Sequence, residues 1–563
     1  MDSRAARSAS TGRASGAGAP LAPRRVLRFD PWVWATVLVA LPCAAVAQST
    51  PTAPAALPST ESPLGLSAYG VEIATEAERL NLARPPASLT LTNQLTATNN
   101  GGLDRRPEAR NDLIASVRPE FALHRRGAGL DLDLQAAATF LGYASGSESG
   151  GVLPDVRGNL KSAVIDRWVF LDAAAVVRQS EVDPFGARAG DRSNVNRRTE
   201  TSYRLSPYIE REFAPNTSFL ARHDFASTRN GAGDGARLTS NQTLVRVERQ
   251  PVPLGAALEA TRMRSETNGS LGTRFSLDTL RARGSLAIAQ QVVLGVVIGQ
   301  DRSSYLLSDQ TDALYGINAQ WTPGPRTQVA AAVEHRFFGK SGSLSIQHRM
   351  PIMSFGISLS RQPVMSSSSL GVLGQGTDVR NFLDAILTTR YPDPTVRSGV
   401  VDSVVSRRGL DTRPTEAVDL VADYPQLQTT VQLTWVLLVS RNTASLTLYS
   451  QTRKRLTRDG DPLSALSTAI ADTRQSGSTL QFNRRLTPRL TASALLRWSK
   501  ISGLAARDTD KSGDTALRLS LLRELSPRTS VSAGVQRDRF TTNVAGQHSY
   551  DATLAFVGMS YRF

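Results

Sequence analysis

Five histidines are the side chains of this sequence best suited to metal binding or proton transfer. They are His124, His223, His335, His348 and His548. None has another histidine two or four positions away, the spacings that bring two imidazoles to one face of a strand or helix. Each is interpreted instead as a residue of a barrel lumen or of an interfacial belt. The sequence therefore predicts no metal site and no cofactor.

Nucleotide-binding and hydrolytic motifs are the other chemistry to consider. The glycine-rich stretch 371–376 matches neither a dinucleotide fingerprint nor a phosphate loop. Serine is abundant, but the sequence contains no G-x-S-x-G motif. We therefore expect the chain not to be an enzyme. A hydrolytic site assembled across strands from a histidine and a serine stays as an alternative.

Charged residues inside otherwise apolar, alternating segments indicate a polar lumen. On the lipid face of a barrel, a cation near the bilayer midplane costs about 2–4 kcal/mol, so such side chains are expected to point inward. Two interpretations stay open: an arginine excess that favours anions, or ion pairs that only stabilise the wall. The candidate lumen residues are Arg204, Glu210, Arg222, Asp224, Arg281 and Arg283.

These charges need strands to position them, and from Ser88 onward the chain repeats one strand-like pattern. Leu130, Leu132 and Leu134, for example, alternate with polar residues. Segments of roughly ten alternating residues separated by turns are typical of a transmembrane β-barrel. The candidate short turns are 125–128, 166–167, 214–216, 251–253, 289–291, 323–325, 351–352, 441–442, 487–488 and 526–528.

Threading strands through these turns predicts an all-β fold, a transmembrane antiparallel barrel of about 22 strands over residues 87–563. Both ends of the barrel fall on the short-turn side, as expected for a bacterial barrel with periplasmic termini. Trp168 and Trp321 stand beside short turns, where aromatic residues form an interfacial belt. The last strand alternates up to Phe563 and resembles the signal that barrel assembly machinery recognises.

Composition and the N-terminus agree with export. Hydrophobic residues make up 40% of the chain and mean hydropathy is −0.21, with no run of about 18 apolar residues after the N-terminus. Arg24, Arg25 and Arg28 precede an apolar stretch, and residues 45–47 form an A-x-A cleavage site. Residues 1–47 are therefore predicted to be a signal peptide. The single cysteine, Cys43, would be removed with it.

The charge of the exported chain bears on its partners. The net charge is +16, and residues 1–47 carry six arginines and two aspartates, so +12 would remain. This balance favours outer-membrane lipid, lipopolysaccharide or acidic glycans over nucleic acid, which an exported chain rarely meets. Residues 48–86 are rich in Pro, Ala, Ser and Thr and predict a periplasmic linker. That segment is too short for the plug domain of a TonB-dependent receptor.

Residues 365–425 have helical rather than alternating periodicity. One apolar stripe includes Val379, Phe382 and Leu383, with Asp378 as its N-cap. A second stripe runs from Thr395 to a stop at Gly409. Strand parity puts this insert on the extracellular side, from which it either folds into the lumen and narrows it or forms a surface cap for partners.

Three stretches carry a resemblance to a known family: 166–173 with 182–186, 196–200 with 205–208, and 334–340 with 344–349. Together they resemble the PEP-CTERM-system-associated outer-membrane protein family, found near exosortase and exopolysaccharide loci. The resemblance implies a β-barrel associated with extracellular polysaccharide or surface-protein export. It implies no catalytic residue.

The function predicted is therefore a passage in the cell outer membrane that serves envelope or exopolysaccharide biogenesis or export. Its partners would be outer-membrane lipid, the barrel assembly machinery and components of polysaccharide export. The alternative is a non-conducting surface scaffold whose loops bind glycan or partner proteins.

Overall fold

The computed structural model describes residues 87–563, apart from short gaps. The gaps are 106–107, 128, 166–167, 189–195, 232–236, 269–273, 306–307, 365–378, 409, 411–424, 457–471 and 505–506. The predicted signal peptide, the predicted linker and Cys43 lie outside the described residues.

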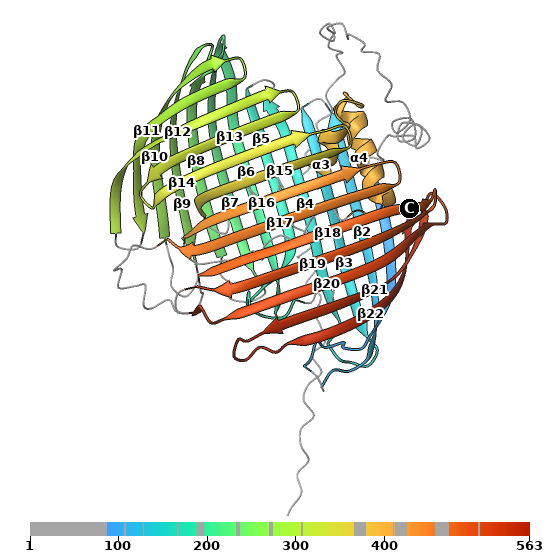
Figure 1. The fold of residues 1–563 in the computed structure, drawn as a ribbon. Coiled ribbons are helices and arrows are strands. Elements are labelled where there is room, and N and C mark those ends of the chain that lie inside the picture. The colour runs from blue at the N-terminus through green and yellow to red at the C-terminus, as the bar shows by residue number, and fades with distance from the viewer. Residues whose placement is uncertain are drawn as a thin grey trace, which may run out of the picture. The chain divides into compact units, whose positions relative to one another are not determined.

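Twenty-two antiparallel strands form one closed barrel (Figure 1). Each strand pairs with its neighbours in sequence, and β1 pairs with β22, so the sheet has no free edge. The strands are β1 (Ala87–Thr98), β2 (Asp112–Gly127), β3 (Leu130–Tyr143), β4 (Gly151–Ile165), β5 (Val169–Glu181), β6 (Arg197–Ala214), β7 (Thr217–Asn230), β8 (Arg237–Arg249), β9 (Leu254–Thr267), β10 (Arg274–Ala289), β11 (Val292–Tyr305), β12 (Ser308–Gly324), β13 (Thr327–Arg336), β14 (Gly339–Arg349), β15 (Met353–Val364), β16 (Gln426–Leu438), β17 (Asn442–Arg455), β18 (Thr473–Thr487), β19 (Leu490–Gly503), β20 (Lys511–Glu524), β21 (Thr529–Thr542) and β22 (Tyr550–Arg562). The predicted barrel and its strand count are confirmed.

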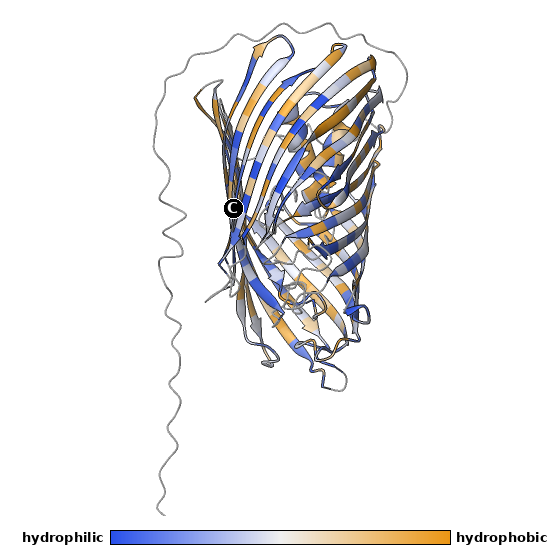
Figure 2. Cartoon of the chain, turned by 90° about the vertical axis from the view of Figure 1, so that its left-hand side faces the viewer, coloured by the Kyte–Doolittle hydropathy of each residue, from blue (hydrophilic) through white to orange (hydrophobic). Residues whose placement is uncertain are grey.

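The period-two pattern divides every strand between an outer and an inner face (Figure 2). On β20 and β22 the outward Leu519, Leu521 and Val557 are 46%, 48% and 50% exposed. Apolar side chains left open around a closed ring of strands are the lipid-facing surface of a transmembrane barrel. The protein is therefore an outer-membrane barrel, since a closed sheet is the form in which strands can cross a membrane.

The connections at one end of the barrel are all short, as predicted. Ten connections, from β2–β3 to β20–β21, join the strands there, and the start of β1 and the end of β22 lie at the same end. We call it the short-turn end, which faces the periplasm in bacterial barrels. Strand β12 continues to Gly324, so the turn expected at 323–325 is displaced toward Arg326. Asn216, in the β6–β7 turn, has a φ of 63°, which asparagine tolerates better than most residues.

Aromatic side chains mark the outer wall near the short turns. Trp168 and Trp321 are 51% and 49% exposed. The guanidinium of Arg211 lies 4.1 Å from the centre of the Trp168 ring. A tryptophan stacked under a cation suits the headgroup level of a membrane, where one end of the residue is apolar and the other is polar.

Two helices occupy the insert between β15 and β16, as the helical periodicity predicted. They are α3 (Val379–Leu387) and α4 (Pro394–Arg408). Asp378 and Gly409, the expected N-cap and stop, lie outside the described residues. Within the part of the chain that the structure describes, neither helix is long and apolar enough to cross a membrane.

The division between faces can be tested with one cation placed on each side of the wall. Leu519→Arg should lower the free energy of unfolding by about 2–4 kcal/mol, because the outer face of β20 meets lipid. Ser520→Arg, on the inner face of the same strand, is the matched control and should cost much less. Denaturant titration in lipid vesicles measures both. Equal costs would contradict this assignment of the faces.

Candidate functional site

Ion pairs line the inner wall, and four of the six predicted lumen residues take part in them. Arg222 Nη1 lies 3.1 Å from Asp172 Oδ2, and its Nε lies 3.0 Å from Asp224 Oδ1. Arg281 Nη2 lies 2.9 Å from Glu334 Oε2. Arg283 pairs with Glu248.

The other two predicted lumen residues have a different surrounding. Arg204 lies opposite Ala226 in the ladder, and Glu210 lies opposite Leu220. Tyr208 of β6 pairs with Arg222 of β7, and Arg204 and Glu210 are an even number of positions from Tyr208. Their side chains therefore point to the same face of the wall as that of Arg222. Among the described residues neither Arg204 nor Glu210 forms an ion pair. The six residues therefore share the inner face without making one site.

The most buried ion pair of the described wall was not predicted from the sequence. Asp301 on β11 is fully buried and Arg336 on β13 is 10% exposed, with Arg336 Nη2 2.8 Å from Asp301 Oδ1. Thr279 on β10 donates to the same carboxylate at 2.8 Å. Alternation places these residues on the inner face, but it does not show that side chains two strands apart meet.

The histidines are dispersed over the barrel. His124, His223 and His348 bond to side chains on neighbouring strands. His335 stacks on Tyr315. His548, in the β21–β22 loop, contacts the backbone carbonyl of Leu103. Within the described residues, no three His, Cys, Asp or Glu side chains are grouped to hold a metal ion.

The helix pair packs on the inner wall through an apolar seam. Phe382, Leu383 and Val400 are buried in one cluster with Val436 and Leu438 of β16. Val436 and Leu438 point to the inner face of β16, because Val431, on the opposite face of the same strand, is 41% exposed on the outside. The helices therefore lie inside the ring of strands (Figure 1).

A glycine in β15 lets α3 approach the wall closely. A Cβ built on Gly356 would lie 3.0 Å from ring carbons of Phe382. That distance is tighter than ordinary van der Waals contact, so a larger residue would push the helix away from the wall.

Polar contacts fasten the end of α4 to the short-turn end. Arg408 is buried and its Nη1 donates to the carbonyl of Val439 at 2.9 Å and to Thr443 Oγ1 at 2.6 Å. Its Nη2 donates to the carbonyl of Ser440 at 3.1 Å. Thr491 Oγ1 donates to the carbonyl of Arg407 at 3.3 Å. The insert leaves and rejoins the wall at the long-loop end, yet its helices are held at the opposite end, so it runs along the lumen.

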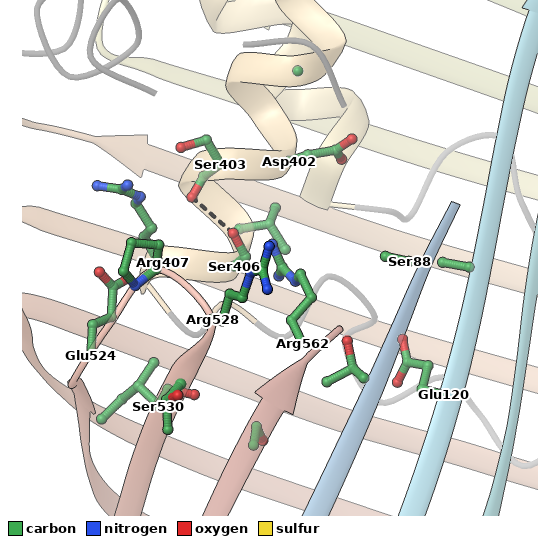
Figure 3. A pocket seen from close by; sticks show the side chains of 18 of the residues that line it. Ser88, Glu120, Asp402, Ser403, Ser406, Arg407, Glu524, Arg528, Ser530 and Arg562 are labelled. Carbon is green, nitrogen blue, oxygen red and sulfur yellow. Dashed lines mark hydrogen bonds between the residues drawn. The ribbon is translucent and has the colours of Figure 1, made fainter. Parts of the chain in front are cut away.

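The other face of the helix pair is polar and borders a cavity of about 510 Å³ (Figure 3). Arg380, Asp402 and Ser406 line it from the helices. The opposite side comes from β1, β2, β3, β20, β21 and β22 and the β20–β21 turn. Arg380 and Asp402 form an ion pair across the two helices. Val405 also lines the cavity from α4, so the helix pair meets it with a mostly polar surface and occupies part of the lumen.

The β5–β6 loop restricts the lumen nearer the long-loop end. Phe185 is fully buried against Ile501 of β19 and Val544. Arg188 Nη1 donates to Ser499 Oγ at 2.8 Å, and Tyr550 Oη donates to the carbonyl of Arg188 at 2.8 Å. Strand β19 is eight strands from β5 around the ring, counted through β1 and β22. The loop therefore reaches across part of the lumen.

The comparisons with known proteins found matches among solved structures only. No protein-family model matches the chain, and no curated protein matches its sequence. Similar structures include the siderophore receptor PirA from Pseudomonas aeruginosa, with 13% identity, a TM-score of 0.40, and 85% of this chain and 81% of that chain covered. The FrpB iron transporter from Neisseria meningitidis has 9% identity and a TM-score of 0.47, with 86% and 84% covered. With identities of 13% and 9% and TM-scores of 0.40 and 0.47, these similarities give no information on the ligand or the mechanism of this chain.

The buried pair of Arg336 and Asp301 gives a stability prediction. Arg336→Gln should lower the free energy of unfolding by about 3–5 kcal/mol, because it leaves a buried carboxylate without its cation. Arg274→Gln breaks an exposed pair, 77% and 49% accessible, and should cost below about 1 kcal/mol. Denaturant titration in lipid vesicles compares the two variants. Similar losses of unfolding free energy in the two variants would show that the buried pair stabilises the protein no more than the exposed pair.

Proposed function

We propose that this protein forms a constricted passage across the outer membrane that serves envelope or exopolysaccharide biogenesis. One observation carries the proposal: the helix pair binds the wall with its apolar face and turns a mostly polar face toward a cavity in the lumen. A constriction element needs one fixed side and one side compatible with water.

The chemistry of the inner wall supports passage of a polar solute. Paired charges such as Arg222 with Asp172 and Arg281 with Glu334 keep the wall hydrated and leave little net field. Such a wall suits a hydrophilic polymer that is not held tightly at any one point.

The link to exopolysaccharide rests on two supports. The sequence resembles a family associated with polysaccharide export. In addition, eight hydroxyl-bearing residues line the cavity beside α4 and would suit the hydroxyl groups of a sugar chain: Ser88, Thr90, Ser403, Ser406, Ser526, Thr529, Ser530 and Ser560.

A non-conducting scaffold is the second candidate, and the β5–β6 loop favours it. Leu103, Phe185 and Val544 come from three different long loops and all bury against inner-wall residues. Loops that fill the lumen in this way would also form a stable platform for a glycan or a partner protein on the outer surface.

Conductance separates the two candidates. In planar bilayers the full chain should show small, steady single-channel currents, and deletion of residues 366–424 should raise the conductance several-fold, because ionic current scales with the open cross-section of the pore. Absence of current from both proteins would contradict the proposed passage and favour the non-conducting scaffold. An unchanged conductance after deletion would show that the helices are no constriction.

A point variant tests how the helices are held. Arg408→Gln removes the contacts of α4 with the β16–β17 turn and should make the current noisy, with openings toward the conductance of the deletion variant. Arg441→Gln changes an exposed arginine of the same turn and should leave the recording as in the unmodified protein. If both variants behave alike, Arg408 does not hold the constriction.

A further inference from the structure

The cavity beside α4 contains a pair of arginines that the barrel itself does not neutralise. Arg528 is in the β20–β21 turn and Arg562 is at the end of β22. The backbone N–H of Arg562 donates to the carbonyl of Arg528 at 2.8 Å, so the two residues lie directly side by side. Both are exposed, and among the described residues neither forms an ion pair. Two like charges placed this close repel each other.

The surrounding residues leave the cavity positively charged. Arg380 is paired with Asp402, and Glu120 lies 3.6 Å from Arg118. That leaves Arg528 and Arg562 against Glu524, which is the only acidic residue without an ion pair among those that line the cavity in the described chain. In Figure 3 Arg528 and Arg562 lie next to each other on the side of the cavity where Ser406 is.

The turn that carries Arg528 is already ordered. Ser526 Oγ accepts the backbone N–H of Arg528 at 3.2 Å and that of Thr529 at 3.0 Å. A side chain that caps its own turn reduces the conformational freedom that a ligand would otherwise have to remove. The arginine pair is therefore presented on a preformed surface.

From these observations we infer that the cavity binds a carboxylated glycan segment at the periplasmic mouth of the barrel. The guanidinium groups bind carboxylates, since arginine donates two parallel hydrogen bonds to such groups. The hydroxyl-bearing residues around them bind sugar hydroxyls. The inference rests on the proposed passage and names its substrate class: an acidic polysaccharide that enters from the short-turn end.

Binding to the purified full chain in detergent tests this inference without any need for conduction. Isothermal titration with trigalacturonate should show saturable binding, and maltotriose, its uncharged counterpart in size, should show none. The double variant R528Q/R562Q should bind trigalacturonate at least about tenfold more weakly, because the charged hydrogen bonds of both guanidinium groups to the carboxylates are lost. The variant R441Q/R489Q removes two exposed arginines of other short turns and should bind like the unmodified chain.

Each other outcome overturns a stated part of the inference. Equal weakening in both double variants would show a general effect of net charge rather than a site. Equal binding of maltotriose would remove the requirement for an anion. Inorganic phosphate that binds as tightly as trigalacturonate would show a site for a single oxyanion rather than for a glycan segment. If the glycan binds as expected but no current is found, the site stands and the protein is a glycan-binding scaffold.

Discussion

Every backbone N–H and C=O group inside a bilayer needs a partner in the protein, because lipid offers none. In this chain the pairing of β1 with β22 completes that requirement, since it joins the two strands that would otherwise be edges. Closure also explains the alternation of side chains. Once the sheet is a ring, one face of each strand meets lipid and the other meets the lumen, so leucine and valine collect outside while serine, threonine and ion pairs collect inside.

A ring of 22 strands encloses more space than wall side chains can fill. The chain fills part of it with segments from its own long loops. The helix pair uses an apolar seam against β15 and β16 and a buried arginine, Arg408, against the β16–β17 turn. The β5–β6 loop uses Phe185 and Arg188 against the wall at β19 and β22. The helix pair turns a mostly polar side toward the cavity at the short-turn end, where Arg528 and Arg562 lie.

Much of this architecture could be predicted because its signals are local. Turn residues such as Asn216 and Ser526 mark where a strand must end, and the alternation between turns fixes which residues share a face. The stripe containing Val379, Phe382 and Leu383 repeats with the helical period, so α3 could be placed without knowledge of its neighbours. Of the six charged residues assigned to the lumen, four find ion-pair partners in the wall. The partnership of Arg336 with Asp301 could not be predicted, because it joins residues 35 positions apart on strands that are not adjacent.

The sequence by itself thus determined the fold class, the number of strands, the position of the short turns and the presence of two helices, since each depends on the period of neighbouring residues and on turn chemistry. The tertiary structure alone decided where the helices lie, which charges meet, and that Arg528 and Arg562 stand side by side without an acidic partner in the described chain. These depend on the stagger and curvature of the closed sheet, which bring together residues far apart in sequence. No local pattern of amino acids records that stagger.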